Sequence, residues 1–189
     1  ARALSPAIAE ARIQALQARI RPHFLYNSIN AVLSLIRSEP KRAERALEDL
    51  ADLFRVLMAD NRALNPLARE IDIARQYLAI EELRLGERLR VTWRIDRMPA
   101  DALVPALLLQ PLVENAVYHG VEPLVEGGEI TIEVTGSDGR ILIRLTNPFR
   151  AGADNHAGNR MALAPIRERL QLHFDAEASL QSRAQGATY

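Results

Sequence analysis

The sequence predicts an α+β fold in which a helical hairpin precedes a mixed lobe of strands and helices. Apolar residues recur at helical spacing through roughly the first 65 residues, whereas runs with the period of a strand begin only at Leu89. The 189 residues carry 24 Lys and Arg against 24 Asp and Glu and are 48% hydrophobic, which is typical of a soluble globular protein of one or two small domains. These observations predict two parts with separate roles.

The first part is predicted to be an antiparallel pair of helices over residues 1–65. The helical spacing of apolar residues runs from Ile8 to Ile36 and is interrupted by Pro22, so a kink is expected near residues 18–22. Pro40 suits the first turn of a second helix, whose apolar stripe is Ala43, Leu47, Leu50, Phe54 and Leu57. Because one partner helix cannot cover both stripes, the hairpin is expected to form a homodimer with a four-helix bundle.

The second part is predicted to combine a linker helix, residues 66–88, with a mixed lobe, residues 89–189. Apolar and polar residues alternate from Leu89 to Asp96 and again on both sides of Gly136-Ser137-Asp138-Gly139, which is the pattern of strands and of a hairpin turn. The remaining elements expected here are a helix from about Pro105 to His119, a loop over 147–160, a helix from about Met161 to Phe174 and a last strand from about Ala178.

Composition and charge exclude several classes of protein. The formal net charge of zero argues against nucleic-acid binding, and the lack of cysteine excludes disulfides, thiolate metal sites and cysteine nucleophiles. The longest strongly apolar stretch, Val104 to Val113, falls far short of the ~20 residues that span a bilayer. The chain opens on Ala1-Arg2-Ala3 within a helical pattern, so we expect it to be part of a longer protein whose other part lies upstream.

His23 is the first candidate for chemistry. It follows Pro22 in a predicted dimerising hairpin, and Asn27 lies one helical turn later on the same face. A neutral imidazole can attack an electrophilic phosphorus if one nitrogen is exposed and the other is held by a partner, a role that Asn27 can fill. The alternative is an inert, partly buried core histidine, which is the usual state of a lone histidine on a helix.

The second candidate is the polar side of the helix predicted around residues 108–120. Apolar residues there occupy one face, which leaves Glu114, Asn115, Tyr118 and His119 near the opposite side. A carboxylate beside a carboxamide can hold a magnesium ion that bridges phosphate oxygens. The alternative is a solvated polar face without a ligand.

Both segments resemble motifs of one family. Gln17-Ala18-Arg19-Ile20-Arg21-Pro22-His23-Phe24-Leu25-Tyr26-Asn27-Ser28-Ile29-Asn30 is similar to the phospho-acceptor box of the LytS-type sensor histidine kinases, and Leu108 to Gly120 is similar to their ATP-binding N box. The similarity continues through the linker helix (Leu67, Glu70, Tyr77, Glu81, Arg84, Gly86 and Arg88) and Ile166 to Leu170. Within the family the chain most resembles the AlgZ/FimS-type branch of pseudomonads.

The resemblance implies a reaction and a set of roles. His23 would accept the γ-phosphoryl group of ATP and pass it to an aspartate of a LytTR-type response regulator, with Asn27 orienting the ring. Asn115 would bind Mg2+, with Glu114, Tyr118 and His119 beside the phosphates. The hairpin would be the dimerisation and phosphotransfer domain, and the lobe would be a Bergerat-type α/β sandwich that binds ATP. The chain would be the cytoplasmic part of a bacterial inner-membrane protein.

The glycine boxes of this family are altered in the chain. Asn147 and Pro148 stand where the family has the Asp that reads adenine and its following glycines, and Gly158 is the one glycine left of the three that cradle phosphates. Arg160 can offer a charged fork to phosphate, and Asn147 can reach the adenine edge through water. The AlgZ/FimS-type branch shares these departures.

The sequence therefore predicts an atypical, homodimeric histidine kinase that uses Mg-ATP. Two alternatives remain open at this point. The altered glycine boxes favour a degenerate kinase that acts as a phosphatase or docking platform for its regulator. A non-enzymatic dimeric scaffold would have an inert His23.

Overall fold

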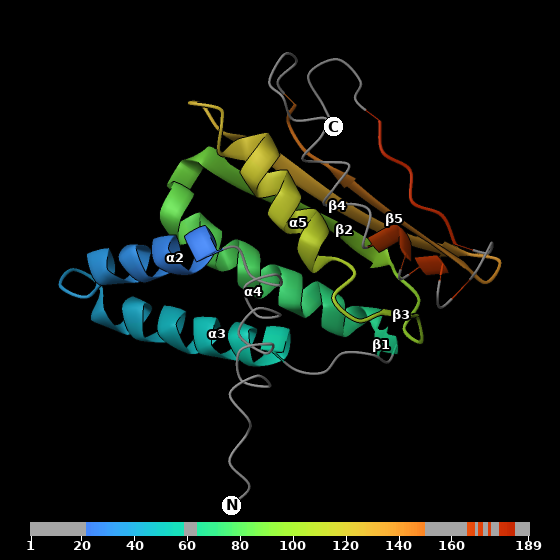
Figure 1. The fold of residues 1–189 in the computed structure, drawn as a ribbon, viewed down its shortest axis with the longest axis horizontal. Helices are drawn as coiled ribbons and strands as arrows, with labels where there is room; N and C mark the ends of the chain where they lie inside the picture. Colours follow the sequence, from blue (N-terminus) through green and yellow to red (C-terminus); the bar gives the residue numbers. More distant parts are fainter. Residues whose placement is uncertain are drawn as a thin grey trace, which may run out of the picture. The chain divides into compact units, whose positions relative to one another are not determined.

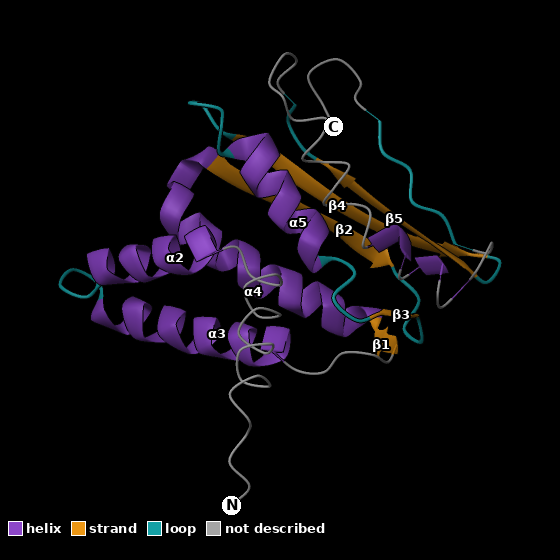
Figure 2. Cartoon of the chain, in the orientation of Figure 1, coloured by secondary structure: helices purple, strands orange, loops and turns teal. Residues whose placement is uncertain are grey.

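Residues 22–58, 64–149, 166–168, 170–171, 174 and 178–183 are described by the computed structural model. The chain divides into two compact units, residues 1–60 and 61–189. The ribbon views show a pair of helices for the first unit and a sheet with helices for the second (Figures 1 and 2). No helix among these described ranges is long and apolar enough to cross a membrane.

The first unit is a helical hairpin, as the sequence predicts. Helix α2 spans Pro22–Leu35 and helix α3 spans Pro40–Met58, with Pro40 in the first turn of α3. The rings of Phe24 and Phe54 lie 6.5 Å apart between the two helices. The buried side of α3 consists of Ala43, Ala46, Leu50, Leu53 and Leu57. Residues 1–21, over which the first helix was expected to continue, lie outside the described residues, as does most of the segment 18–22 in which a kink was expected.

The second unit is built on a three-stranded sheet of order β2-β4-β5. Strand β2 (Leu89–Arg97) is parallel to β4 (Gly128–Ser137), and β4 is antiparallel to β5 (Arg140–Thr146). Asp138 and Gly139 form the two-residue turn between β4 and β5, and both have positive φ, 52° and 72°. Positive φ at both central residues is typical of a type I′ turn, whose twist matches that of the two strands in a β-hairpin. The predicted hairpin is confirmed.

Helices cover one face of this sheet. Helix α4 (Leu67–Leu85) packs on β2 and on α5 (Gln110–Asn115), and the π-helical turn η2 (Ala116–Val121) packs on β4 (Figure 1). Alternation along β4 turns Ile130, Ile132 and Val134 into this interface, where all three are fully buried. A 3-10 turn, Gly86–Arg88, joins α4 to β2. Residues 67–85 thus pack within the second unit.

The segment before α5 differs from the prediction. A helix was expected from Pro105, but Leu103–Pro105 form strand β3, which pairs antiparallel with β1 (Leu64–Pro66). A turn at 106–109, in which Leu107 has a φ of 56°, delays the helix to Gln110. The last strand expected from Ala178 is also wrong, because the described residues 178–183 have no strand.

Candidate functional site

His23 lies exposed on the first turn of helix α2. Asn27, one turn later, places its Nδ2 atom 3.0 Å from Nδ1 of the imidazole. The spacing of four residues along a helix produces this contact, because such side chains lie one above the other. The structure thus brings together the two residues predicted in the first motif, and it leaves the Nε2 edge of the ring directed away from this bond.

The neighbouring side chains fix this part of α2 on the hairpin. Phe24, directly after His23, is 7% exposed, and Ser28 is buried with its hydroxyl donating to the carbonyl oxygen of Phe24 at 2.7 Å. An exposed imidazole beside buried anchors is held in position while it remains accessible to another molecule.

In the second unit, Glu114 and Asn115 end helix α5. Asn115 is buried, with 6% of its surface exposed. Gln110, at the start of α5, donates from Nε2 to Oε1 of Glu114 at 2.9 Å, and this i,i+4 bond holds the carboxylate. Oε1 of Gln110 is buried without a hydrogen-bond partner in the described part of the chain. Helix α5 therefore holds the Glu114 carboxylate in a fixed position directly before Asn115.

Tyr118 and His119 follow within the π-helical turn. Their rings meet edge to face with centroids 4.8 Å apart, and Tyr118 is 45% exposed. Single π-helical turns occur frequently at functional sites, because the extra residue in the turn redirects side chains. The four predicted residues of the second motif thus lie together on α5 and η2.

Asn147 and Pro148, which stand where the resemblance places the Asp and glycines of the first glycine box, pack against two glycines. Asn147 is buried and donates from Nδ2 to the carbonyl oxygen of Pro148 at 2.7 Å. A Cβ atom on Gly120 would meet the Asn147 side chain and come within 3.0 Å of the Pro148 carbonyl oxygen, and one on Gly128 would meet the Pro148 ring. Asn147 therefore lies at the end of the helical turn that carries His119. Gly158 and Arg160 lie outside the described residues.

The described donor set fits Mg2+ and a nucleotide phosphate in its chemistry. Mg2+ takes oxygen ligands and is usually held by one or two protein groups with substrate phosphates, and a carboxylate beside a carboxamide supplies such groups at Glu114 and Asn115. The orphaned Oε1 of Gln110 adds a buried acceptor next to them.

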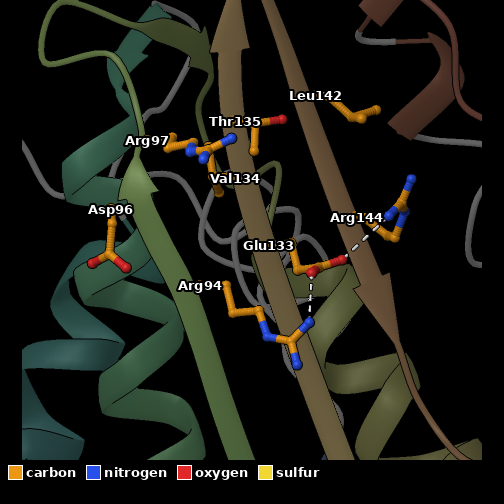
Figure 3. A pocket seen from close by; sticks show the side chains of 8 residues that line it. All are labelled: Arg94, Asp96, Arg97, Glu133, Val134, Thr135, Leu142 and Arg144. Carbon is orange, nitrogen blue, oxygen red and sulfur yellow. Dashed lines mark hydrogen bonds and ion pairs between the residues drawn. The ribbon is translucent and has the colours of Figure 1, made fainter.

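The opposite face of the sheet carries a different set of side chains. An open depression there is lined by Arg94, Asp96, Arg97, Glu133, Val134, Thr135, Leu142 and Arg144 (Figure 3). Arg94 on β2 and Arg144 on β5 both reach Glu133 on the middle strand, at 2.9 and 3.4 Å. The hydrogen bond from Arg94 lowers the pKa of Glu133. Because its lining comes from β2, β4 and β5, this depression is separate from the motif on α5 and η2.

Sequence reasoning missed three polar residues that the structure connects to the second motif. Glu70 and Glu81 on α4 are 1% and 3% exposed, and Gln110 is 3% exposed. The sequence contains a pattern that indicates burial of the two glutamates. Positions 70, 74, 77 and 81 follow the spacing of one helix face, and Ala74 and Tyr77 on that face are buried. Charged residues in phase with a buried stripe predict internal ion pairs or hydrogen bonds.

Comparison with known proteins gives a consistent result. Residues 11–89 match the histidine kinase family model. The chain is 34% identical over 176 residues to the sensor histidine kinase YpdA of Escherichia coli (strain K12), which covers 87% of this chain and 31% of that protein. It is 33% identical over 165 residues to the sensor protein LytS of Oceanobacillus iheyensis, covering 87% of this chain and 27% of that protein.

A further relative extends the match to nearly all of the chain. The sensor histidine kinase/phosphatase LytS of Staphylococcus aureus (strain Mu50 / ATCC 700699) is 29% identical over 201 residues, which cover 98% of this chain and 34% of that protein. The chain therefore spans about a third of the length of the curated relatives that it matches.

Proposed function

We propose that the chain is the catalytic part of a two-component sensor kinase that phosphorylates itself on His23. Residues 11–89 match the histidine kinase family model, and most of the chain is similar to sensor proteins that include a sensor histidine kinase and a LytS sensor. The observation that carries the proposal is the exposed imidazole of His23, whose Nδ1 contacts Asn27 at 3.0 Å. A nucleophilic histidine needs one nitrogen held and the other accessible. Both conditions apply to this side chain.

The proposed chemistry at His23 uses its Nε2 lone pair. Nε2 attacks the γ-phosphorus of ATP, a P–N bond forms, the bond to the bridging oxygen breaks, and ADP leaves. Nε2 carries a lone pair only in the neutral ring whose proton is on Nδ1. Rotation of the Asn27 carboxamide by half a turn brings Oδ1 to accept that proton's hydrogen bond. Asn27 thereby selects the reactive tautomer, and the surplus proton leaves to water around the exposed ring.

The proposed nucleotide site lies on α5 and η2, within a Bergerat-type lobe. Asn115 and Glu114 would hold Mg2+, which when bound neutralises charge on the transferred phosphoryl group. Gln110 keeps the Glu114 carboxylate in place through the bond at 2.9 Å. Tyr118, His119 and Asn147 border the phosphates and base, and Gly158 and Arg160 are assigned to the phosphate loop from the sequence motif alone.

We also propose that the hairpin forms a homodimer through its uncovered apolar residues. Along α2 and the turn after it, exposed apolar side chains recur at 25, 29, 33 and 36, and Leu47 on α3 is 47% exposed. This spacing is that of one helix stripe, and a second copy would cover it in a four-helix bundle. The dimer would present two His23 side chains on its surface.

The proposed partner is a LytTR-type response regulator, and the proposed setting is the cytoplasmic side of a bacterial inner membrane, in the AlgZ/FimS-type branch.

A second function is favoured by a specific observation: Asn147 and Pro148 pack against Gly120 and Gly128, where the family has an open glycine box. A lobe so filled would bind ATP weakly and suit a regulator phosphatase or docking platform. One LytS relative is named a kinase/phosphatase.

The first test is a calorimetric titration of the chain with Mg-ATP, on the unmodified protein, on Asn115→Ala and on Asn30→Ala. Asn30 is an exposed asparagine of the hairpin and controls for the substitution itself. We expect binding that only Asn115→Ala removes. Transfer of 32P from labelled ATP should then depend on His23, so that His23→Gln takes up no label. Absence of binding by a folded dimer would contradict the kinase and favour the docking or phosphatase function.

A further inference from the structure

Helix α4 contacts the start of the α5–η2 segment through a buried carboxylate. Glu70 accepts hydrogen bonds from the backbone amides of Leu107 at 3.0 Å and Leu108 at 2.9 Å, one on each carboxylate oxygen, and a third from Asn65 at 3.2 Å. Leu107 has a φ of 56°, which a leucine rarely adopts. Two hydrogen bonds that backbone amides donate to a 1% exposed carboxylate stabilise this turn, and α5 begins directly after it.

The same helix contacts the other end of the segment through arginine. Arg84 bonds Glu81 on its own helix at 2.6 Å and reaches Glu122, directly after η2, at 3.0 Å. Arg88, in the 3-10 turn that follows α4, donates from Nη2 to the backbone oxygens of Glu122 at 2.9 Å and Leu124 at 2.8 Å. The chain that leaves η2 is therefore held by one charge pair and two charged hydrogen bonds.

Between these two ends, α4 lies beside the polar residues of α5. Tyr77 is 4% exposed, and burial together with the nearby carboxylates of Glu81 and Glu114 raises the pKa of its phenol. Helix α5, which carries Glu114, packs on α4. The polar face of α4 thus follows the candidate nucleotide segment along its length.

We propose that Glu70 and Arg84 are positioning residues, which hold the two ends of the Gln110–Val121 segment on helix α4 and so set the orientation of Glu114 and Asn115 toward a nucleotide. This inference rests on the proposed function for its ligand, Mg-ATP. We call these contacts of Glu70 and Arg84 with the two ends of the segment the clamp. The clamp can be measured in the second unit without nucleotide. Neither residue needs to touch the ligand for its loss to weaken binding.

The test for Glu70 is hydrogen exchange of backbone amides in Glu70→Gln, with Asp72→Asn as the matched control, an exposed carboxylate of the same helix. A carboxamide has an NH2 donor in place of one carboxylate oxygen, and the two backbone amides bond different oxygens of Glu70, so one buried N–H faces another donor. We expect exchange at Leu107, Leu108 and along α5 to become about tenfold faster or more, with β4 unchanged. Uniform acceleration that includes β4, or none, would overturn the proposal.

Arg84→Lys tests the other end and decides the question if Glu70→Gln does not fold. Lysine keeps the charge but cannot bridge Glu81 and Glu122 with a planar fork. We expect faster exchange at Glu122, whose amide bonds Val117 at 2.9 Å, and no change in Arg69→Lys, an exposed arginine of the same helix. Equal exchange in both lysine variants would overturn the role of Arg84.

Mg-ATP titration of the same variants separates the clamp from the proposed function. We expect the dissociation constant to rise about tenfold in Glu70→Gln, under conditions in which β4 exchange shows the lobe to be folded. An unchanged dissociation constant with faster local exchange would overturn the positioning role. If the unmodified chain binds no Mg-ATP, the proposed function is wrong. The positioning role is then wrong as well, because it needs that ligand. The exchange data still establish or exclude the clamp in that case.

Discussion

Replacement of Asn27 by alanine should slow phosphorylation of His23 without changing affinity for Mg-ATP. The substitution removes one hydrogen bond of 3.0 Å to Nδ1. Such a bond contributes about 0.5–1.5 kcal/mol net, and the exposed position of His23 places it near the middle of this range or below. Since 1.4 kcal/mol is about tenfold in rate, the expected loss is about two- to fivefold.

The assay is single-turnover labelling with 32P-ATP at saturating nucleotide, together with a titration for the dissociation constant. Asn30→Ala, the same chemical change on the same helix, should label at the rate of the unmodified chain. A rate unaffected in Asn27→Ala would refute the idea that Asn27 orients the ring. A loss above about a hundredfold would also refute a purely orienting role, because one exposed hydrogen bond is too weak for that effect. Asn27 would then have to take part in proton transfer.

Three further predictions concern stability. Gly120→Ala should destabilise the second unit by about 1–3 kcal/mol, because the added Cβ meets the Asn147 side chain; an unchanged urea midpoint would contradict this packing. Burial raises the pKa of Glu81 above its ordinary 4.5. The contribution of the protonated Glu81 to folding stability is therefore present below pH 4.5 and is lost as pH rises through the folded-state pKa. Glu81→Gln has no such loss, so its stability relative to the unmodified chain should increase between about pH 4 and 7; parallel pH profiles of the two proteins would exclude the effect. Leu53→Ala, fully buried in the hairpin, should lose about 2–5 kcal/mol in urea unfolding at every protein concentration, whereas Leu47→Ala, 47% exposed in the single chain, should lose stability only at concentrations at which the proposed dimer forms. A loss at Leu47 that does not change with protein concentration would contradict its place in a dimer interface.

Much of the fold follows from short-range patterns in the sequence. Pro40 and the apolar stripe of α3 predict a helix because propensity, first-turn chemistry and periodicity agree there. The turn at Asp138-Gly139 is predicted because both positions need positive φ. The expected stripe included Leu47, which is exposed, and omitted Ala46 and Leu53, which are buried. Both sets of residues have helical spacings of three and four, so periodicity alone does not decide which of them packs.

The error before α5 has a long-range cause. Residues 105–109 are apolar and are typical of the start of a helix. Glu70, 37 residues earlier, instead accepts a hydrogen bond from the backbone amide of Leu107, which has a positive φ and lies in a turn. Pairing of β3 with β1 adds a second contact from a distant segment. A local pattern contains neither contact, so it cannot show that tertiary structure overrides helix propensity here.

The residues of the candidate site were proposed from the resemblance of two segments to family motifs. The contact of Asn27 with His23 was expected from their spacing of four on a helix, and the two nitrogen atoms lie 3.0 Å apart. Asn115 was expected on the polar side of its helix but is buried, with 6% of its surface exposed. The hydrogen bond that orients Glu114 was not anticipated. Gln110 is among apolar neighbours in the sequence, and only the helix that forms from Gln110 brings its amide to Glu114.

The place of helix α4 bears on where a chimera could join the two units of this chain to foreign segments. Leu67–Leu85 joins the sheet, the α5–η2 segment and the strand pair β1–β3, although in sequence it follows the hairpin directly. A chimera that grafts a foreign hairpin after Leu85 would remove the carboxylate and the arginine on which the second unit depends. A joint placed before Leu64 would keep these contacts intact, so the natural boundary for exchanging modules lies upstream of β1.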